Sequence, residues 1–165
     1  MFIREVIVYN GNITQATCKG RTNMNATLHG SIGFWLKKNY RNACNYLDQM
    51  LEEQGVTNSQ LGVLMILWEE EGRTQKDMVH ILGIQPASMT FLLRGLEDRG
   101  MINRVPDKLD TRINRIYLTD KGSSIKEACL AIVEEGEKMI RQGFSDQEIA
   151  LMLHWMKRVD SNFQG

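Results

Sequence analysis

The chain has 165 residues with 20 basic and 20 acidic side chains, so its formal net charge is zero, and its length suits one domain, with or without helices that pair with a second copy. The longest apolar run, residues 61–68, is far shorter than the ~20 residues that span a bilayer, which argues against a membrane helix. Three scattered cysteines without C-x-x-C spacing predict neither a zinc site nor a disulfide framework, so we expect a reduced, cytoplasmic protein.

Residues 1–28 differ in character from the rest of the chain. Residues 2–9 are strand-like, whereas residues 10–30 are rich in Asn, Thr and Gly and have little apolar periodicity. Met24 would make a natural start of the protein. We therefore expect residues 1–28 to be a poorly ordered or non-native extension.

From residue 31 onwards, apolar side chains recur at three- to four-residue spacing, which predicts a long helix that Gly55 closes. The sequence Thr57-Asn58-Ser59-Gln60 then matches a capping box, so we expect a second helix that ends near Gly72. Arg73 is expected to pair as a short β-bridge with a later hairpin. After Thr119, a helix to about Gln142, a stop at Gly143, a capping box at residues 145–148 and a last apolar helix complete the chain. The apolar residues expected on this last helix are Ile149, Met152, Leu153, Met156, Val159 and Phe163.

Residues 74–98 predict two short helices separated by a tight turn. Thr74 can cap the first helix, Gly83 can end it, and Pro86 suits the first turn of the second. The second helix buries one stripe and leaves polar and small residues off it. The expected stripe is Met89, Leu92, Leu93 and Leu96, and the residues off it are Gln85, Ala87, Ser88, Thr90, Phe91 and Arg94. This pattern fits a helix-turn-helix, although an ordinary helical hairpin in an all-α core fits it as well.

A predicted hairpin favours the helix-turn-helix. Two extended stretches flank a charged loop at residues 106–112, and four basic residues gather there: Arg104, Lys108, Arg112 and Arg115. Arginine suits a narrow minor groove, where the negative potential is deepest. Asp110 and Arg112 alternate, so the carboxylate can hold the guanidinium. The competing interpretation is a solvated turn.

This stretch resembles the MarR (multiple-antibiotic-resistance regulator) family of bacterial transcription factors. The motifs that carry the likeness are Leu96-Glu97-Asp98-Arg99-Gly100, then Arg104, Asp107, Asp110 and Arg112, then Leu118-Thr119-Asp120-Lys121-Gly122. The likeness covers roughly residues 31–159. Family members often carry basic residues where this chain has Phe91 and Thr111.

The resemblance implies a mainly α protein with a small β-wing. Residues 57–119 would form a winged helix-turn-helix that binds double-stranded DNA, and residues 29–56 and 120–165 would form dimerisation helices; packing of these helices within one subunit is the alternative. Ser88 and Thr90 would face the major groove, with Gln85 near the helix start and Arg94 on phosphate. Phe91 would touch a thymine methyl, and Arg112, braced by Asp110, would enter the minor groove.

By the same resemblance, the protein would be a homodimeric repressor on a palindromic operator, released by a small aromatic effector. Four side chains are candidates for lining the effector cleft: Trp35, Tyr40, Met65 and Trp68. Aromatic and methionine side chains on apolar helix faces are more often plain core, which is the competing interpretation.

The neutral total hides a mild charge asymmetry. Residues 73–119 carry eight basic and five acidic side chains, whereas residues 1–72 carry six and seven, and residues 120–165 carry six and eight. A positive excess on one unit is the electrostatic signature of nucleic-acid binding. Because this excess is small, we expect salt-sensitive binding with few phosphate contacts.

The sequence also bears on two other classes of function, an enzyme and a protein-binding module. The sequence has no evident nucleophile–base pair, no glycine-rich phosphate loop and no metal-ligand spacing, so we expect no enzyme, no cofactor and no metal site. The alternative is a winged-helix module that binds another protein through Phe91, without binding DNA. Cys44 lies near an apolar helix stripe, which favours a buried structural cysteine over a redox role.

Overall fold

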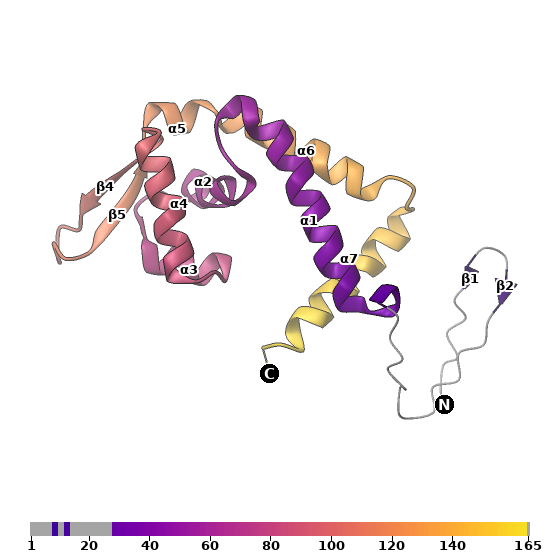
Figure 1. Cartoon of the computed structure of the whole chain (residues 1–165). Helices are drawn as coiled ribbons and strands as arrows, with labels where there is room; N and C mark the ends of the chain where they lie inside the picture. Colours follow the sequence, from indigo (N-terminus) through magenta and orange to yellow (C-terminus); the bar gives the residue numbers. More distant parts are fainter. Residues whose placement is uncertain (1–7, 10–11, 14–27, 165) are drawn as a thin grey trace. The chain divides into compact units, whose positions relative to one another are not determined.

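The computed structural model describes residues 8–9, 12–13 and 28–164 (Figure 1). The chain forms two compact units, residues 1–37 and 38–165. In the first unit, strands β1 (Val8–Tyr9) and β2 (Asn12–Ile13) pair antiparallel, and a 3-10 turn, η1 (Leu28–Gly30), precedes helix α1 (Ile32–Leu51). The expected extension of residues 1–28 lies largely outside the described residues and stays a prediction.

The second unit is mainly helical, as the sequence predicted. The end of α1 leads into a 3-10 turn, η2 (Glu52–Gln54), and Gly55 closes it with a φ of 68°. The helices that follow are α2 (Asn58–Glu69), α3 (Gln75–Leu82), α4 (Pro86–Asp98), α5 (Asp120–Ser124), α6 (Lys126–Arg141) and α7 (Asp146–Ser161). The capping boxes predicted at Thr57 and Ser145 are both present, and α2 ends three residues earlier than Gly72.

The second unit also contains a three-stranded antiparallel sheet. One strand lies between α2 and α3 in the sequence, and the other two lie between α4 and α5. Its strands are β3 (Arg73–Thr74), β4 (Ile102–Pro106) and β5 (Asn114–Leu118), in the order β3-β5-β4. Arg73 pairs with Ile116, and Ile102 pairs with Leu118. This register confirms that Arg73 joins the hairpin by a short β-bridge, and it ties the hairpin to the segment that precedes α3.

The core of the second unit joins the hairpin to α2, α3 and α4. Met78, Met89, Leu93, Leu96, Ile102 and Ile116 are all at most 1% exposed and belong to one cluster. Burying a side chain of this size contributes about 1.5–3 kcal/mol relative to leaving it in water. Because α4 and the hairpin share this core, their outward faces are held in a fixed relation to each other.

The prediction of a single helix from Thr119 to about Gln142 is wrong in one respect. The helix is broken at Ile125 into α5 and α6. Two serine hydroxyls precede the break and donate to backbone carbonyls. Ser123 Oγ donates to the carbonyl of Thr119 (3.0 Å), and Ser124 Oγ donates to that of Lys121 (2.9 Å). Such bonds compete with the helical ladder and bend helices. Phe163, expected on the last helix, lies beyond its end at Ser161.

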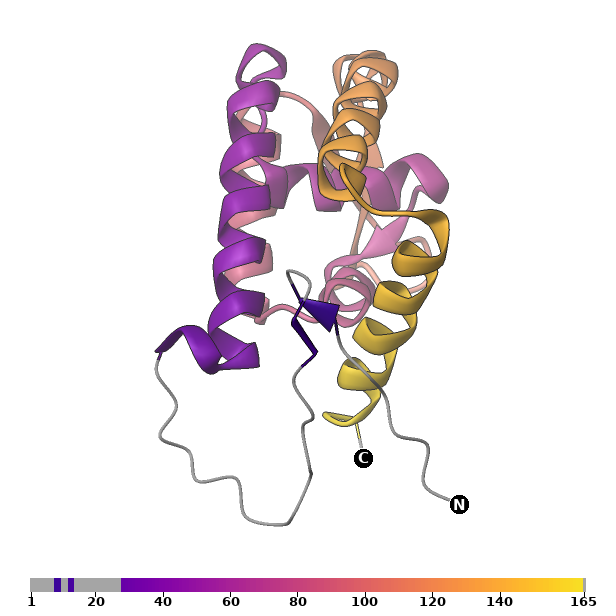
Figure 2. The same cartoon turned by 90° about the vertical axis from the view of Figure 1, so that its right-hand side faces the viewer.

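Helices α6 and α7 are joined by a short turn (Figure 2). Gly143 lies in this turn and has a φ of 86°. Along α7, Ile149 is buried, but many apolar side chains are exposed. They are Leu151, Leu153, Trp155 and Met156, with Met139, Ile140 and Phe144 before them at the end of α6 and in the turn. Exposed apolar surfaces of this kind are typical of interaction surfaces.

Candidate nucleic-acid interface

The segment from Thr74 to Asp98 folds as a helix, a tight turn and a second helix. Thr74 caps α3 and forms a capping box with Asp77, whose carboxylate accepts from the Thr74 amide (3.0 Å). These hydrogen bonds from Thr74 lower the pKa of Asp77. Gly83 ends α3 with a φ of 61°, and Pro86 stands in the first turn of α4. The predicted caps and helix order are therefore confirmed.

Helix α4 divides into a buried and an exposed face as predicted. Met89, Leu93 and Leu96 are fully buried, and Leu92 is half-buried. The proposed contact residues are all exposed: Gln85, Ser88, Thr90, Phe91 and Arg94. Phe91 is 76% exposed on this outer face.

Thr90 is exposed, but its hydroxyl is already engaged. It donates to the carbonyl of Pro86 (3.0 Å) and accepts from Nε2 of Gln75 (2.7 Å). Gln75 is the first residue of α3, so this contact joins the starts of the two helices. Sequence reasoning did not single out Gln75, because no periodic pattern relates two residues on different helices.

The hairpin β4–β5 forms a wing whose loop, residues 107–113, we call the wing tip. Asp107 is 8% exposed, and its Oδ1 accepts from the backbone amides of Leu109 (2.7 Å) and Asp110 (3.2 Å). Its Oδ2 accepts from Nε of Arg115. These donors, led by the Leu109 amide, lower the pKa of Asp107 to about 2. Asp107 was noted in the sequence only as part of a motif, and its positioning role was missed.

Arg115 connects the wing tip to the base of the wing. Besides its ion pair with Asp107, it donates from Nη1 to the carbonyl of Gly72 (2.8 Å). Gly72 is buried with a φ of 77°, and a Cβ there would lie 3.1 Å from the hydroxyl of Tyr117. The Asp107 carboxylate raises the pKa of Arg115, so the pair stays charged.

Asp110 and Arg112 make the contact that their alternation suggested. Arg112 donates from Nε to Oδ1 of Asp110 (3.0 Å) and from Nη2 to Oδ2 (3.3 Å). The Arg112 side chain is nevertheless 88% exposed. The hydrogen bonds from Arg112 lower the pKa of Asp110. A forked pair of this kind fixes a guanidinium in one orientation while leaving its outer face free.

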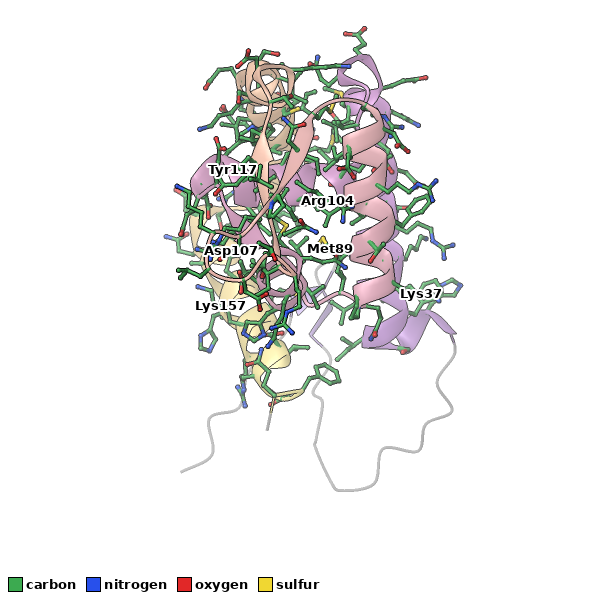
Figure 3. All side chains as sticks on the ribbon, turned by 90° about the vertical axis from the view of Figure 1, so that its left-hand side faces the viewer. Lys37, Met89, Arg104, Asp107, Tyr117 and Lys157 are labelled. Carbon is green, nitrogen blue, oxygen red and sulfur yellow. The ribbon has the colours of Figure 1, made fainter. Side chains whose placement is uncertain are left out.

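A further ion pair connects the wing to α4. Arg104 on β4 donates from Nε to Oε2 of Glu97 on α4 (3.0 Å). Figure 3 shows Arg104 and Asp107 on the hairpin beside α4, with Met89 on the inner side of that helix. Half-exposed pairs contribute little to stability, at roughly 0–1 kcal/mol, so this pair adds only weakly to the shared core that holds the wing against α4.

Ion pairs neutralise part of the positive excess of residues 73–119. Arg104 and Arg115 are paired with Glu97 and Asp107. In the part of the chain that the structure describes, four further basic side chains of this segment form no ion pair and are exposed: Lys76, Arg94, Arg99 and Lys108. The unpaired positive charge therefore lies on α3, on α4 and its C-terminal end, and on the wing tip.

The candidate effector residues have different environments. Trp35, in the first unit, donates from Nε1 to the carbonyl of His29 (2.8 Å) and packs edge-to-face on Phe34. In the second unit, Trp68 is half-buried and donates from Nε1 to the carbonyl of Gly122 (3.1 Å). It lines a shallow hollow with Leu67, Glu69, Glu71, Leu118, Ser123 and Lys126.

Tyr40 and Met65 do not line that hollow, and both are exposed. A hydrogen bond with Cys44 raises the pKa of Tyr40. Cys44 is half-buried rather than buried as expected, and its Sγ accepts from Nδ2 of Asn58 (3.3 Å). Within the second unit, the structure thus does not gather these candidates into one enclosed cavity, and the effector site stays a prediction.

Two features of the described residues bear on other classes of function. Among residues 8–9, 12–13 and 28–164, no three side chains of His, Cys, Asp or Glu come together in a way that could hold a metal ion. No helix in the same part of the chain has both the length and the apolar character needed to cross a membrane.

Fold and site together define a winged helix-turn-helix protein, and comparison with known proteins places it more narrowly. The MarR family model matches residues 56–113. The organic hydroperoxide resistance transcriptional regulator of Bacillus subtilis is 30% identical over 105 residues, which are 64% of this chain and 71% of that protein. The chain therefore belongs to the MarR family, as its motifs predicted.

Two further similarities support this assignment. The HTH-type transcriptional regulator TtmR of Methylorubrum extorquens is 39% identical over 77 residues, which are 47% of this chain but only 40% of that regulator. The crystal structure of a complex of MepR from S. aureus with DNA superposes with a TM-score of 0.76 at 28% identity, over 80% of this chain and 98% of MepR.

Proposed function

We propose that this chain is a DNA-binding transcriptional regulator, and more specifically a repressor, that acts as a homodimer on a palindromic operator. The observation that carries this proposal is the exposed face of α4 beside a wing whose Arg112 is held in position by Asp110. A relative with the same fold, MepR, has been crystallised with DNA, which supports DNA as the partner.

Helix α4 would enter the major groove with its N-terminus first. Ser88 and Thr90 would contact base edges there, Gln85 would lie near the helix start, and Arg94 would contact phosphate. A hydroxyl has one proton and two lone pairs, so Thr90 keeps one lone pair for a base donor after its two internal hydrogen bonds. Phe91 would pack on a thymine methyl, because an exposed aromatic ring matches that group.

The wing would enter the adjacent minor groove. Arg112 is exposed and oriented by Asp110, and a guanidinium is attracted to the deep negative potential of a narrow groove. Because uncompensated positive charge is limited to a few residues, binding would depend on salt with a modest slope.

Dimerisation would follow from the exposed apolar side chains of α6 and α7. Pairing of two copies about a two-fold axis would bury these side chains and place two copies of α4 about one helical turn, ~34 Å, apart. Such an arrangement reads a palindrome, which is why we propose a palindromic operator.

A small aromatic effector would release the protein from DNA by acting on the same dimer. Binding of such a molecule near Tyr40, Met65 or Trp68 of the second unit would change the spacing of the two α4 helices and so cost contacts in both half-sites. The indole N–H of Trp68 is occupied by Gly122, so this residue would offer a ligand its ring face rather than a hydrogen bond.

A second candidate function is supported by one observation, the 76% exposure of Phe91. Aromatic anchors are enriched at protein–protein interfaces, so a winged-helix module that binds another protein would use Phe91 in this way. Selection from a pool of randomised DNA duplexes separates the two functions. We expect enrichment of a palindrome; if no duplex is retained even at low salt, the protein-binding function is favoured instead.

A further inference from the structure

The wing tip is closed on itself by backbone hydrogen bonds. The amide of Asp107 donates to the carbonyl of Ile113 (2.8 Å), and the amide of Ile113 donates to the carbonyl of Asp110 (2.9 Å). The Asp107 carboxylate then accepts the amides of Leu109 and Asp110 from inside the loop. The backbone that carries Leu109 is therefore fixed on both sides.

Leu109 is 98% exposed at this fixed position. A single exposed leucine is ordinary on a protein surface and carries no meaning by itself. Here, however, its amide is held by a carboxylate that is almost buried, and burying a carboxylate is costly unless several donors satisfy it. The loop thus fixes the backbone position from which an apolar side chain extends into water.

We propose that Leu109 is an apolar DNA contact of the wing, inserted into the minor groove beside Arg112 and held in place by Asp107. This proposal rests on the proposed function. Leucine is among the side chains that proteins use in the minor groove, where the sugar walls are apolar. A contact fixed before binding also avoids the entropy cost of ordering the loop on the DNA.

The neighbouring charges favour DNA over a protein surface as the partner of Leu109. Lys108 precedes it and is exposed, and Arg112 follows on the same tip with 88% of its side chain exposed. The acidic side chains of the tip, Asp107 and Asp110, are both taken up by arginines. Leu109 thus lies between two exposed cationic side chains. This arrangement suits DNA, because DNA phosphates are negative and the sugars that line its grooves are apolar.

The test is Leu109→Ala in the full chain, compared with the parent chain and with Val105→Ala as a matched control. Val105 is an apolar residue of the same hairpin that lies outside the wing tip. Binding to the selected duplex is measured by fluorescence anisotropy at several salt concentrations. We expect Leu109→Ala to bind about fivefold to tenfold more weakly, which corresponds to burial of part of a leucine side chain.

Three further readouts identify the contact as apolar, local and dependent on the loop that carries Leu109. The salt dependence of Leu109→Ala should equal that of the parent chain, because no counterion is involved, whereas Arg112→Ala should reduce the slope by about one. The melting temperature of Leu109→Ala should not change, since the side chain packs against nothing. In an Asp107→Ala background, Leu109→Ala should cost less than twofold, because the loop that presents the leucine then has no side-chain acceptor for its two amides.

An affinity of Leu109→Ala within twofold of the parent chain would overturn the contact, as would an equal loss in Val105→Ala. An altered salt slope in Leu109→Ala would also overturn it. These outcomes leave the proposed function intact, because the parent chain still binds its duplex. Failure of the parent chain to bind any duplex would instead overturn the function, and this contact with it.

Discussion

At the scale of single residues, Asp107 organises more of the wing than any motif revealed. One carboxylate accepts two backbone amides of the wing tip and the guanidinium of Arg115, which in turn donates to Gly72 at the base of the wing. Hydrogen bonds to the charged form of a carboxylate favour that form. Asp107 therefore keeps its charge far into the acidic range.

The low pKa of Asp107 predicts a defined dependence of stability on pH. A carboxylate whose pKa is lowered to about 2 in the folded chain, from an ordinary 3.8, stabilises the fold above its ordinary value. This contribution is lost as the pH falls through about 2. We expect the difference in free energy of unfolding between the parent chain and Asp107→Asn to be constant at pH 5–7 and to shrink below pH 4. Urea unfolding at each pH measures it, and a difference that did not change down to pH 2 would contradict this role.

Gly122 and Gly62 predict opposite effects of the same substitution. A Cβ on Gly122 would lie 2.1 Å from the carbonyl oxygen of Met101, whereas a Cβ on Gly62 would meet only Leu82 at 3.7 Å. Replacing a helical glycine with alanine is favourable by roughly 0.5–1 kcal/mol where there is room. We expect Gly62→Ala to gain about that much and Gly122→Ala to lose about 1–3 kcal/mol through overpacking against backbone. Thermal unfolding of the two variants checks this, and a stable Gly122→Ala would show that the hairpin can shift.

At the scale of elements, α4 separates stability from recognition on its two faces. Leu93 is fully buried, and Phe91, two residues earlier, is 76% exposed. We expect Leu93→Ala to cost about 2–5 kcal/mol of stability. Phe91→Ala should stay within about 0.5 kcal/mol of the parent chain. For DNA binding, however, we expect a clear effect of the exposed residue. Phe91→Ala should weaken binding roughly fivefold, as expected for a lost apolar contact. Unfolding and binding measured on the same samples test both statements. Unchanged DNA affinity in Phe91→Ala would favour its role as an anchor for another protein.

Most element boundaries were predictable because local chemistry determines them. Thr57 and Ser145 form the capping boxes that their sequences indicated, and Gly83 takes the positive φ that a helix end requires. The break at Ile125 was not predictable from apolar spacing, which continues across it. The break depends on the backbone carbonyls to which the hydroxyls of Ser123 and Ser124 donate. The spacing of apolar residues carries no information about these hydrogen bonds.

Part of the candidate interface was predictable for the same reason. Asp110 and Arg112 are two residues apart in a loop, so their contact could be inferred from the sequence. Gln75 and Thr90 lie on different helices, and Trp68 and Gly122 are 54 residues apart, so only the fold brings them together.

At the scale of the whole molecule, the exposed apolar residues of α7 predict self-association. Trp155 is 52% exposed there, and Lys157 is an exposed charged residue on the same helix. We expect the parent chain to sediment as a dimer and Trp155→Glu to shift toward the monomer, because a buried unpaired charge opposes pairing. Lys157→Ala should remain dimeric and serves as the control. A monomeric parent chain at micromolar concentration would contradict the dimer, and with it the reading of a palindrome.

The measurement that tests the central claim most directly is DNA binding by Arg112→Ala at low and high salt. Arg141→Ala is the matched control, because Arg141 on α6 is also an exposed arginine that donates from Nε to a carboxylate, that of Glu137 at 3.2 Å. We expect the parent chain and Arg141→Ala to bind the selected duplex equally and Arg112→Ala to bind roughly tenfold more weakly with a shallower salt dependence. Equal binding by all three proteins would contradict a wing that enters the minor groove through Arg112.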